Sequence, residues 1–89
     1  MQMEKIYKNN DGAIYAGSFN DWMLDNGAKI MHTIARPNTY IERFYTLNGT
    51  AVEYREEIGP RVNITIRSGQ KKNLESVCKA VEKKFKGLD

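Results

Sequence analysis

The sequence contains few of the residues that build metal centres and disulfide-bonded folds. It has one cysteine, Cys78, and one histidine, His32, in 89 residues. A structural zinc site needs four ligands, so we expect neither such a metal site nor a cofactor. A single cysteine cannot form an internal disulfide, and a lone thiol is typical of a reducing compartment. We therefore expect a cytoplasmic protein.

Long apolar segments and targeting signals are also missing. No apolar run approaches the roughly 18 residues that a membrane span needs. The N-terminal stretch MQMEKIYKNNDG has no apolar segment of the kind found in a signal peptide. The hydrophobic fraction of 40% and the charged fraction of 28% are typical of a soluble folded protein. We expect residues 1–89 to form one soluble domain with a modest core.

The charges that are present are distributed unevenly. The net charge is +3, but residues 1–60 carry six basic and eight acidic side chains, whereas residues 61–89 carry eight basic and three acidic ones. A positive end attracts polyanions. The alternative is a solvated, lysine-rich helix that only keeps the protein in solution.

Turn signals divide the chain into short segments. Asn9-Asn10-Asp11-Gly12, Asp25-Asn26-Gly27, Asn48-Gly49 and Gly59-Pro60 are all sequences that favour turns. Between them, apolar and polar residues mostly alternate, which is typical of strands with one buried face. We expect strands at Glu4–Lys8, Ala13–Phe19, Lys29–Ala35, Tyr40–Leu47, Ala51–Ile58 and Arg61–Arg67, with Asn20–Asp25 as a short helical turn.

Lys71–Lys86 is the clearest helix. Its apolar residues fall on one face of a 3.6-residue period, and Gly87 is placed to end it. The sequence therefore predicts an α+β fold, in which a curved antiparallel β-sheet of five or six strands is followed by one C-terminal amphipathic helix. One helix covers only one face of such a sheet, so the other face is left for solvent, a ligand or a second subunit.

The uncovered face is the first candidate site. If Val62, Ile64 and Ile66 lie under the helix, Arg67 points outward. Neighbouring strands then add further candidates, provided that Phe44 and Tyr54 point inward. Arginines neutralise phosphates, and tyrosines stack on unpaired bases. The predicted contacts are Arg43, Tyr45, Arg55 and Arg67. A one-residue slip in a strand would move its members to the other face.

The start of the helix is the second candidate site. Lys71 and Lys72 lie where backbone N–H groups and the helix dipole favour an anion such as phosphate. The alternative is a polar loop with Ser68 near a capping position.

Catalytic patterns are weak. Cys78 lies on the apolar stripe of the helix, where a thiol is usually inert. Glu56 and Glu57 are adjacent in a predicted strand and so point to opposite faces. No P-loop glycine motif occurs. We expect a protein that is not an enzyme and has no catalytic residues.

Two resemblances suggest functions. Lys5-Ile6-Tyr7 followed by Gly12-Ala13-Ile14-Tyr15-Ala16-Gly17-Ser18 resembles the paired motifs of GIY-YIG nucleases. That resemblance implies a degenerate nuclease in which Tyr7, Tyr15 and Glu42 stand at catalytic positions.

The second resemblance is one of layout. The chain resembles the positive-cofactor-four coactivators and Whirly proteins in two places. The segments 10–15 and 21–27 resemble the family's hairpin, and Ile64-Thr65-Ile66 leading into the Leu74–Phe85 helix resembles its last strand and helix. That family binds single-stranded DNA as a dimer, with helices packed at the subunit interface. The resemblance implies a homodimer whose partner is single-stranded nucleic acid, DNA more than RNA.

The leading hypothesis is therefore non-catalytic binding of single-stranded nucleic acid. The predicted phosphate contacts are Arg43, Arg55, Arg67, Lys71 and Lys72. The predicted stacking residues are Tyr45 and Tyr15. The alternative is a small protein-interaction module, such as a phage-type inhibitor that binds a host protein. The degenerate nuclease is the third hypothesis.

Overall fold

The computed structural model describes residues 2–88, which form five strands and two helices. The strands are β1 (Met3–Asn9), β2 (Lys29–Arg36), β3 (Tyr40–Leu47), β4 (Thr50–Glu57) and β5 (Arg61–Ser68); the helices are α1 (Ala16–Asp25) and α2 (Lys71–Lys84). The predicted α+β class is confirmed. Within the described residues, neither helix is both long and apolar enough to cross a membrane.

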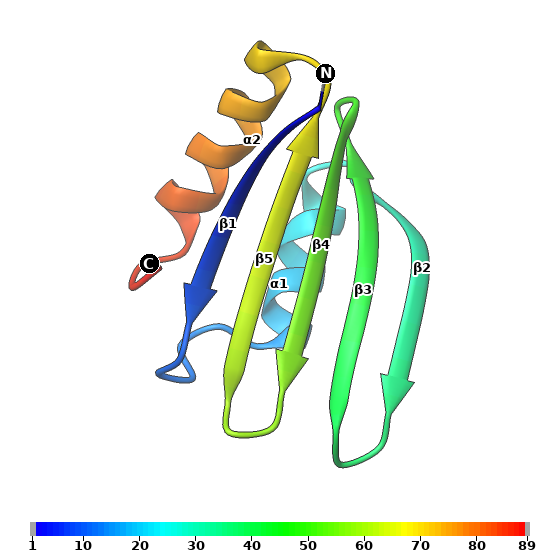
Figure 1. Cartoon of the computed structure of the whole chain (residues 1–89), viewed down its shortest axis with the longest axis vertical. Coiled ribbons are helices and arrows are strands. Elements are labelled where there is room, and N and C mark those ends of the chain that lie inside the picture. The colour runs from blue at the N-terminus through cyan, green and yellow to red at the C-terminus, as the bar shows by residue number, and fades with distance from the viewer. Residues whose placement is uncertain (1, 89) are drawn as a thin grey trace.

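All five strands belong to one antiparallel sheet in the order β1-β5-β4-β3-β2. Strands β2 to β5 follow one another as hairpins, and β1 lies beside β5, so that β1 and β2 are the two edges (Figure 1). The antiparallel sheet predicted from the alternating pattern is confirmed, with five strands.

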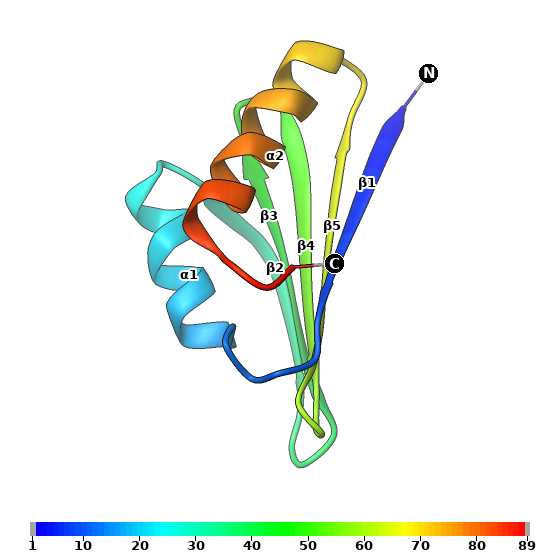
Figure 2. The same ribbon diagram turned by 90° about the vertical axis from the view of Figure 1, so that its left-hand side faces the viewer.

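Both helices lie on the same face of the sheet (Figure 2). The core lies between them and the sheet, and contains Phe19 and Met23 of α1, Val77 and Val81 of α2, and the inward side chains of β3, β4 and β5. We call the other side of the sheet the open face. An uncovered face was expected from the sequence, although the sequence led us to expect only one full helix.

The second helix is the main difference from the prediction. Residues 13–19 were expected to be a strand, and that prediction is wrong, because α1 begins at Ala16. Phe19 and Met23 are four residues apart and lie on the buried side of the helix. The Ala16 N–H donates to Glu56 Oε1 at 2.8 Å, so a carboxylate from β4 binds the start of the helix.

Helix α2 has the predicted apolar face but is shorter than predicted. It ends at Lys84, and the next residue, Phe85, is extended and buried against Phe19 and Trp22. Gly87 has the expected positive φ of 78°, but it lies beyond the helix end rather than directly after it. Packing of the Phe85 ring thus ends the helix before the glycine.

The β3–β4 turn fixes the register of the central strands. Asn48 and Gly49 both have positive φ, 50° and 67°, as a two-residue hairpin turn of this class requires. Leu47 is therefore opposite Thr50, and Tyr45 is opposite Val52. This register decides which side chains lie on the open face.

Candidate binding surface

The open face carries charges of both signs. Side chains alternate along each strand, so the neighbours of buried residues point outward. In β1, β3, β4 and β5 these outward residues include four basic and four acidic side chains: Lys8, Arg55, Arg61, Arg67, Glu4, Glu42, Glu53 and Glu57. Lys29 and Arg36 of β2 point to the same side, because they are opposite Thr46 and Tyr40. On four of the five strands the face is therefore balanced rather than basic, and its positive excess lies along β2.

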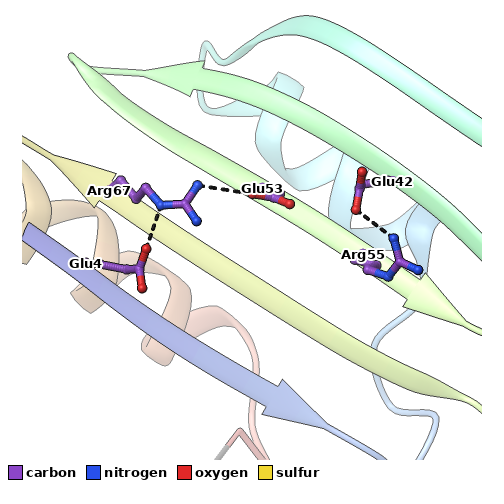
Figure 3. A network of polar contacts seen from close by, with 5 residues as sticks. All are labelled: Glu4, Glu42, Glu53, Arg55 and Arg67. Atoms are coloured by element: carbon purple, nitrogen blue, oxygen red, sulfur yellow. Dashed lines mark hydrogen bonds and ion pairs between the residues drawn. The ribbon is translucent and has the colours of Figure 1, made fainter.

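Arg67 is held between two carboxylates from neighbouring strands (Figure 3). Its Nε donates to Glu4 Oε2 at 2.6 Å, and an Nη atom donates to Glu53 Oε2 at 3.1 Å. The hydrogen bond to Glu4 is the main reason that the pKa of Arg67 is raised. The positive charge of this side chain is thus compensated within the protein.

Arg55 has a similar environment. An Nη atom donates to Glu42 Oε2 at 2.8 Å (Figure 3), and Nε lies 3.7 Å from Glu57 Oε1. The guanidinium also lies over the ring of Tyr40, 3.9 Å from its centroid. The hydrogen bond to Glu42 is the main cause of the raised pKa of Arg55.

Tyr45 does not lie on the open face, and the sequence-based expectation for it is wrong. Its side chain is only 2% exposed, and its hydroxyl donates to Asn20 Oδ1 at 2.8 Å beneath α1. Burial raises the pKa of the phenol. A ring in this position cannot stack on a base. Phe44, expected to point inward, lies instead on the open face opposite Glu53.

Arg43 follows Tyr45 to the helix side, because residues two apart in a strand share a face. It is opposite Tyr54, half-buried, and its Nε donates to Thr33 Oγ1 at 3.3 Å. Of the four predicted contacts, the structure therefore places only Arg55 and Arg67 on the open face. The Asn48-Gly49 turn was the signal for the correct register, because a two-residue turn pairs Leu47 with Thr50.

The remaining predicted site residues lie away from the open face. Tyr15 is 59% exposed and lies at the start of α1. Lys71 and Lys72 are exposed in the first turn of α2, where Lys71 Nζ lies 3.9 Å from Glu75 Oε1. Ser68 Oγ accepts the Gln70 N–H at 3.1 Å just before the helix.

Most basic side chains that are not on the open face lie on α2. The exposed lysines of this helix and of the segment after it form what we call the lysine surface: Lys71, Lys72, Lys79, Lys83, Lys84 and Lys86. The sequence indicated this concentration of positive charge, but most of the predicted binding residues were on the sheet.

The residues implied by the nuclease resemblance are not brought together. Tyr7 is buried on the helix side, where its hydroxyl hydrogen-bonds Glu82. Glu42 lies on the open face with Arg55, and Tyr15 is at the start of α1. Because the sheet separates Tyr7 from Glu42, the three side chains do not form one site.

Potential metal ligands and nucleophiles are likewise dispersed. Among residues 2–88, no group of three or more His, Cys, Asp or Glu side chains is placed to bind a metal ion. Cys78 is buried in α2, and this burial raises the pKa of its thiol. His32 lies on β2, at the far edge of the sheet, with its ring centroid 5.9 Å from that of Phe44.

The edge strand β2 is the most exposed element of the sheet. Seven of its eight residues are exposed, and Ile34 is half-buried. Ile30 and Met31 are 43% and 66% exposed at a bulge in the pairing with β3. The open face, the lysine surface and β2 are therefore three exposed surfaces that differ in charge and composition.

Comparison with protein-family models, with curated protein sequences and with solved structures found no match for this chain.

Proposed function

We propose that this chain is a non-catalytic protein-interaction module that binds its partner through the exposed parts of its sheet. The observation that carries this proposal is the pairing of charges on the open face. Arg55 and Arg67 each contact two glutamates. Binding a polyanion there would require these ion pairs to open, whereas a protein surface with its own mixed charges can meet them intact.

The composition of the open face supports a protein partner. Protein interfaces as a whole are about as apolar as the rest of a protein surface, and aromatic and arginine side chains are enriched in them. Phe44 and Tyr40 of β3 and Arg55 of β4 provide these groups on the open face, and Thr46 and Thr65 lie on the same face.

Site-specific photo-crosslinking tests this function. A photoreactive residue is introduced at Phe44 or Thr65 on the open face, and at Ser76 on the exposed side of α2 as the matched control. In nuclease-treated extract of the source cells, we expect a discrete crosslinked protein from the open-face positions and none from Ser76. Crosslinking that is absent, or equal at all three positions, would contradict the proposal.

Single-stranded nucleic acid is the second candidate, and the lysine surface favours it. Lysines that contact phosphates release bound counterions, which makes such binding strongly dependent on salt. We place the phosphate contacts on α2, including Lys71 and Lys72, rather than on the sheet. The resemblance to the coactivator and Whirly proteins favours DNA over RNA.

Fluorescence anisotropy of a labelled single-stranded DNA tests this second candidate. Binding should weaken steeply with salt, and Lys79→Glu/Lys83→Glu should reduce the slope of log K against log salt by about one per lost phosphate contact. Arg67→Glu, on the open face, is the control and should change little. No binding at low salt would remove this candidate.

We further propose a cytoplasmic location and a homodimer. A reduced, buried thiol such as Cys78 suits a reducing compartment. A second copy would compete with the partner protein for the open face, because the lysine surface and β2 carry one sign of charge and repel their own copies. Sedimentation velocity over a concentration series measures the oligomeric state.

A further inference from the structure

Within residues 2–88, strand β2 has backbone hydrogen-bonding groups on its outer side that no strand pairs with. In this part of the chain it lies at the edge of the sheet and pairs only with β3. Its eight residues make it as long as β3, β4 and β5. A long exposed edge is a template on which another strand can form.

The opposite edge is protected in a way that β2 is not. Helix α2 packs against β1, and the Tyr7 hydroxyl joins it to Glu82 of that helix. β1 also carries charges of both signs, with Glu4, Lys5 and Lys8. On β2, by contrast, seven of the eight residues are exposed and Ile34 is half-buried.

The charge of β2 is of one sign only. Lys29 and Arg36 stand at its two ends, and no acidic residue occurs between Asn26 and Ile41. His32 is the central polar residue. A pairing strand with carboxylates at both ends would therefore meet a cation at each end.

Between its charged ends, β2 carries an apolar residue on each side of the sheet. Ile30 is opposite Tyr45 and so points to the helix side, whereas Ile34 is opposite Glu42 and points to the open face. Met31 projects at the bulge and is the most exposed large apolar side chain among the described residues. Apolar residues in the middle of an added strand could pack on both Ile30 and Ile34.

We propose that β2 binds an extended segment of a partner protein as an additional strand of the sheet, and that this segment carries carboxylates at both ends of an apolar centre. This inference rests on the proposed interaction function and specifies its partner. Main-chain hydrogen bonds supply the affinity, as in other cases of strand addition, and the end charges supply the selectivity.

A second copy of this chain fits β2 poorly. If two β2 strands pair antiparallel over their full length, Lys29 of each copy is opposite Arg36 of the other. Like charges placed directly opposite are destabilising. The charge pattern therefore favours an acidic partner over self-pairing.

Titration with a synthetic peptide tests the proposal. The probe is fluorescein-labelled Asp-Glu-Val-Val-Thr-Val-Val-Glu-Asp with blocked ends, which places valines on both sides of the added strand. We expect Lys29→Glu/Arg36→Glu to weaken binding by about tenfold or more, because two attractive ion pairs become repulsive. The matched control, Lys79→Glu/Lys83→Glu, has the same net charge and should leave the affinity within about twofold, because α2 is remote from β2.

Two N-methylated peptides test whether a strand is really added. Successive N–H groups of a strand point to opposite edges. Methylation of the N–H groups that face β2 removes the donors that pair with it, whereas methylation of the N–H groups that face away leaves those donors in place. We expect only one set to abolish binding, and we expect amide chemical-shift changes to concentrate in β2 and β3. Equal effects of both sets, or equal loss in the two charge-reversal variants, would overturn the proposal.

Other occupants of β2 have distinct signatures. A single-stranded oligonucleotide that displaces the peptide and binds Lys29→Glu/Arg36→Glu poorly would assign β2 to a polyanion. A dimer in sedimentation that Met31→Lys dissociates would assign β2 to a second copy. Either result overturns the proposal. A protein crosslinked at the open face without peptide binding at β2 removes this inference alone and leaves the interaction function standing.

Discussion

At the scale of single residues, the buried tyrosines show how the core accommodates polar atoms. Tyr45 and Tyr54 are both nearly inaccessible, and their hydroxyls donate to Asn20 and Glu56 at 2.8 Å. Tyr7 similarly contacts Glu82. Each phenol thus keeps a hydrogen-bond partner, which a buried polar group needs if it is not to destabilise the fold.

These tyrosines should make the protein sensitive to alkali. Burial, and then the hydrogen bond to a carboxylate, raise the pKa of Tyr7 and Tyr54. The unfolded phenols ionise near pH 10. Their contribution to stability is therefore complete below about pH 10 and is lost as pH rises above it, because the unfolded chain releases the proton first.

The measurement is the free energy of unfolding in guanidinium between pH 8 and pH 11. Wild type should lose more stability over this range than Tyr54→Phe, which has no phenol there to ionise. Tyr15→Phe, at an exposed position, is the control and should follow wild type. The same pH dependence in all three proteins would contradict the interpretation.

At the scale of elements, the ring of Phe19 packs α1 against the sheet and against the segment after α2. Phe19 is fully buried, stacks on Tyr54 with centroids 4.7 Å apart, and meets Tyr45 edge-on at 5.8 Å. Phe85 from the segment after α2 lies against it at 5.5 Å. This cluster therefore joins both helices to the central strands.

Phe19→Ala should destabilise the protein by about 3–5 kcal/mol, because it removes a fully buried ring and leaves a cavity. Leu24→Ala in the same helix is the control. Leu24 is 45% exposed, so its truncation should cost much less. Urea unfolding monitored by circular dichroism compares them. Equal losses in the two variants would show that α1 does not depend on this cluster.

The start of α2 is a second element with a measurable property. Gln70 is the N-cap and makes no side-chain capping bond, and no acidic residue lies in the first turn. Gln70→Asp should stabilise the protein by about 0.5–2 kcal/mol, since aspartate accepts a bond from the free N–H groups and favours the helix dipole.

A comparison with Gln70→Glu separates the effect of the cap on stability from the effect of the added charge. It adds the same charge on a longer side chain that is a poor N-cap, so it should stabilise the protein less than Gln70→Asp. The readout is again the free energy of unfolding. A loss of stability in Gln70→Asp would mean that the bond from Asn73 to Gln70 Oε1, at 3.3 Å, is worth more than a cap.

At the scale of the whole molecule, charges of different kinds occupy different surfaces. The open face has paired charges, α2 carries the lysine surface, and β2 is basic with an apolar centre. Positive residues on an edge strand are a common protection against edge-to-edge association. The same residues of β2 could thus select a partner and prevent self-pairing.

Removing the end charges of β2 should therefore promote association. We expect Lys29→Thr/Arg36→Thr to form oligomers at lower protein concentration than wild type, because threonine favours strands and no longer repels a second copy. Lys79→Thr/Lys83→Thr loses the same charge on α2 and serves as control. Light scattering over a concentration series is the measurement. Equal association of both variants would trace the effect to net charge alone.

Much of the secondary structure could be predicted from local sequence. Strand β3 was predicted with its observed bounds, and β4, β5 and α2 to within one or two residues. Alternation with period two and the 3.6-residue apolar period are local properties, and Asn48-Gly49 is a strong turn signal. The curvature of the sheet stays a prediction.

Residues 13–19 show where local pattern fails. Their short run of apolar and small residues fits a strand as well as a helix, and periodicity alone does not separate the two for such a segment. The helix is selected by burial of Phe19 and Met23 on the sheet and by the contact from Glu56 to the Ala16 N–H. These partners are distant in sequence.

The sequence by itself determined the α+β class, the turns, the apolar face of α2 and the concentration of lysines near the C-terminus, because each depends on residues close together in the chain. Only the tertiary structure decided that Tyr45 is buried, that Arg55 and Arg67 are paired with glutamates of other strands, and that β2 forms an uncovered edge. Tyr40–Leu47 carries aromatic residues on both sides, so its alternating pattern does not show which side is buried. Strand order and register, which bring residues such as Glu4 and Arg67 together, resolve that choice.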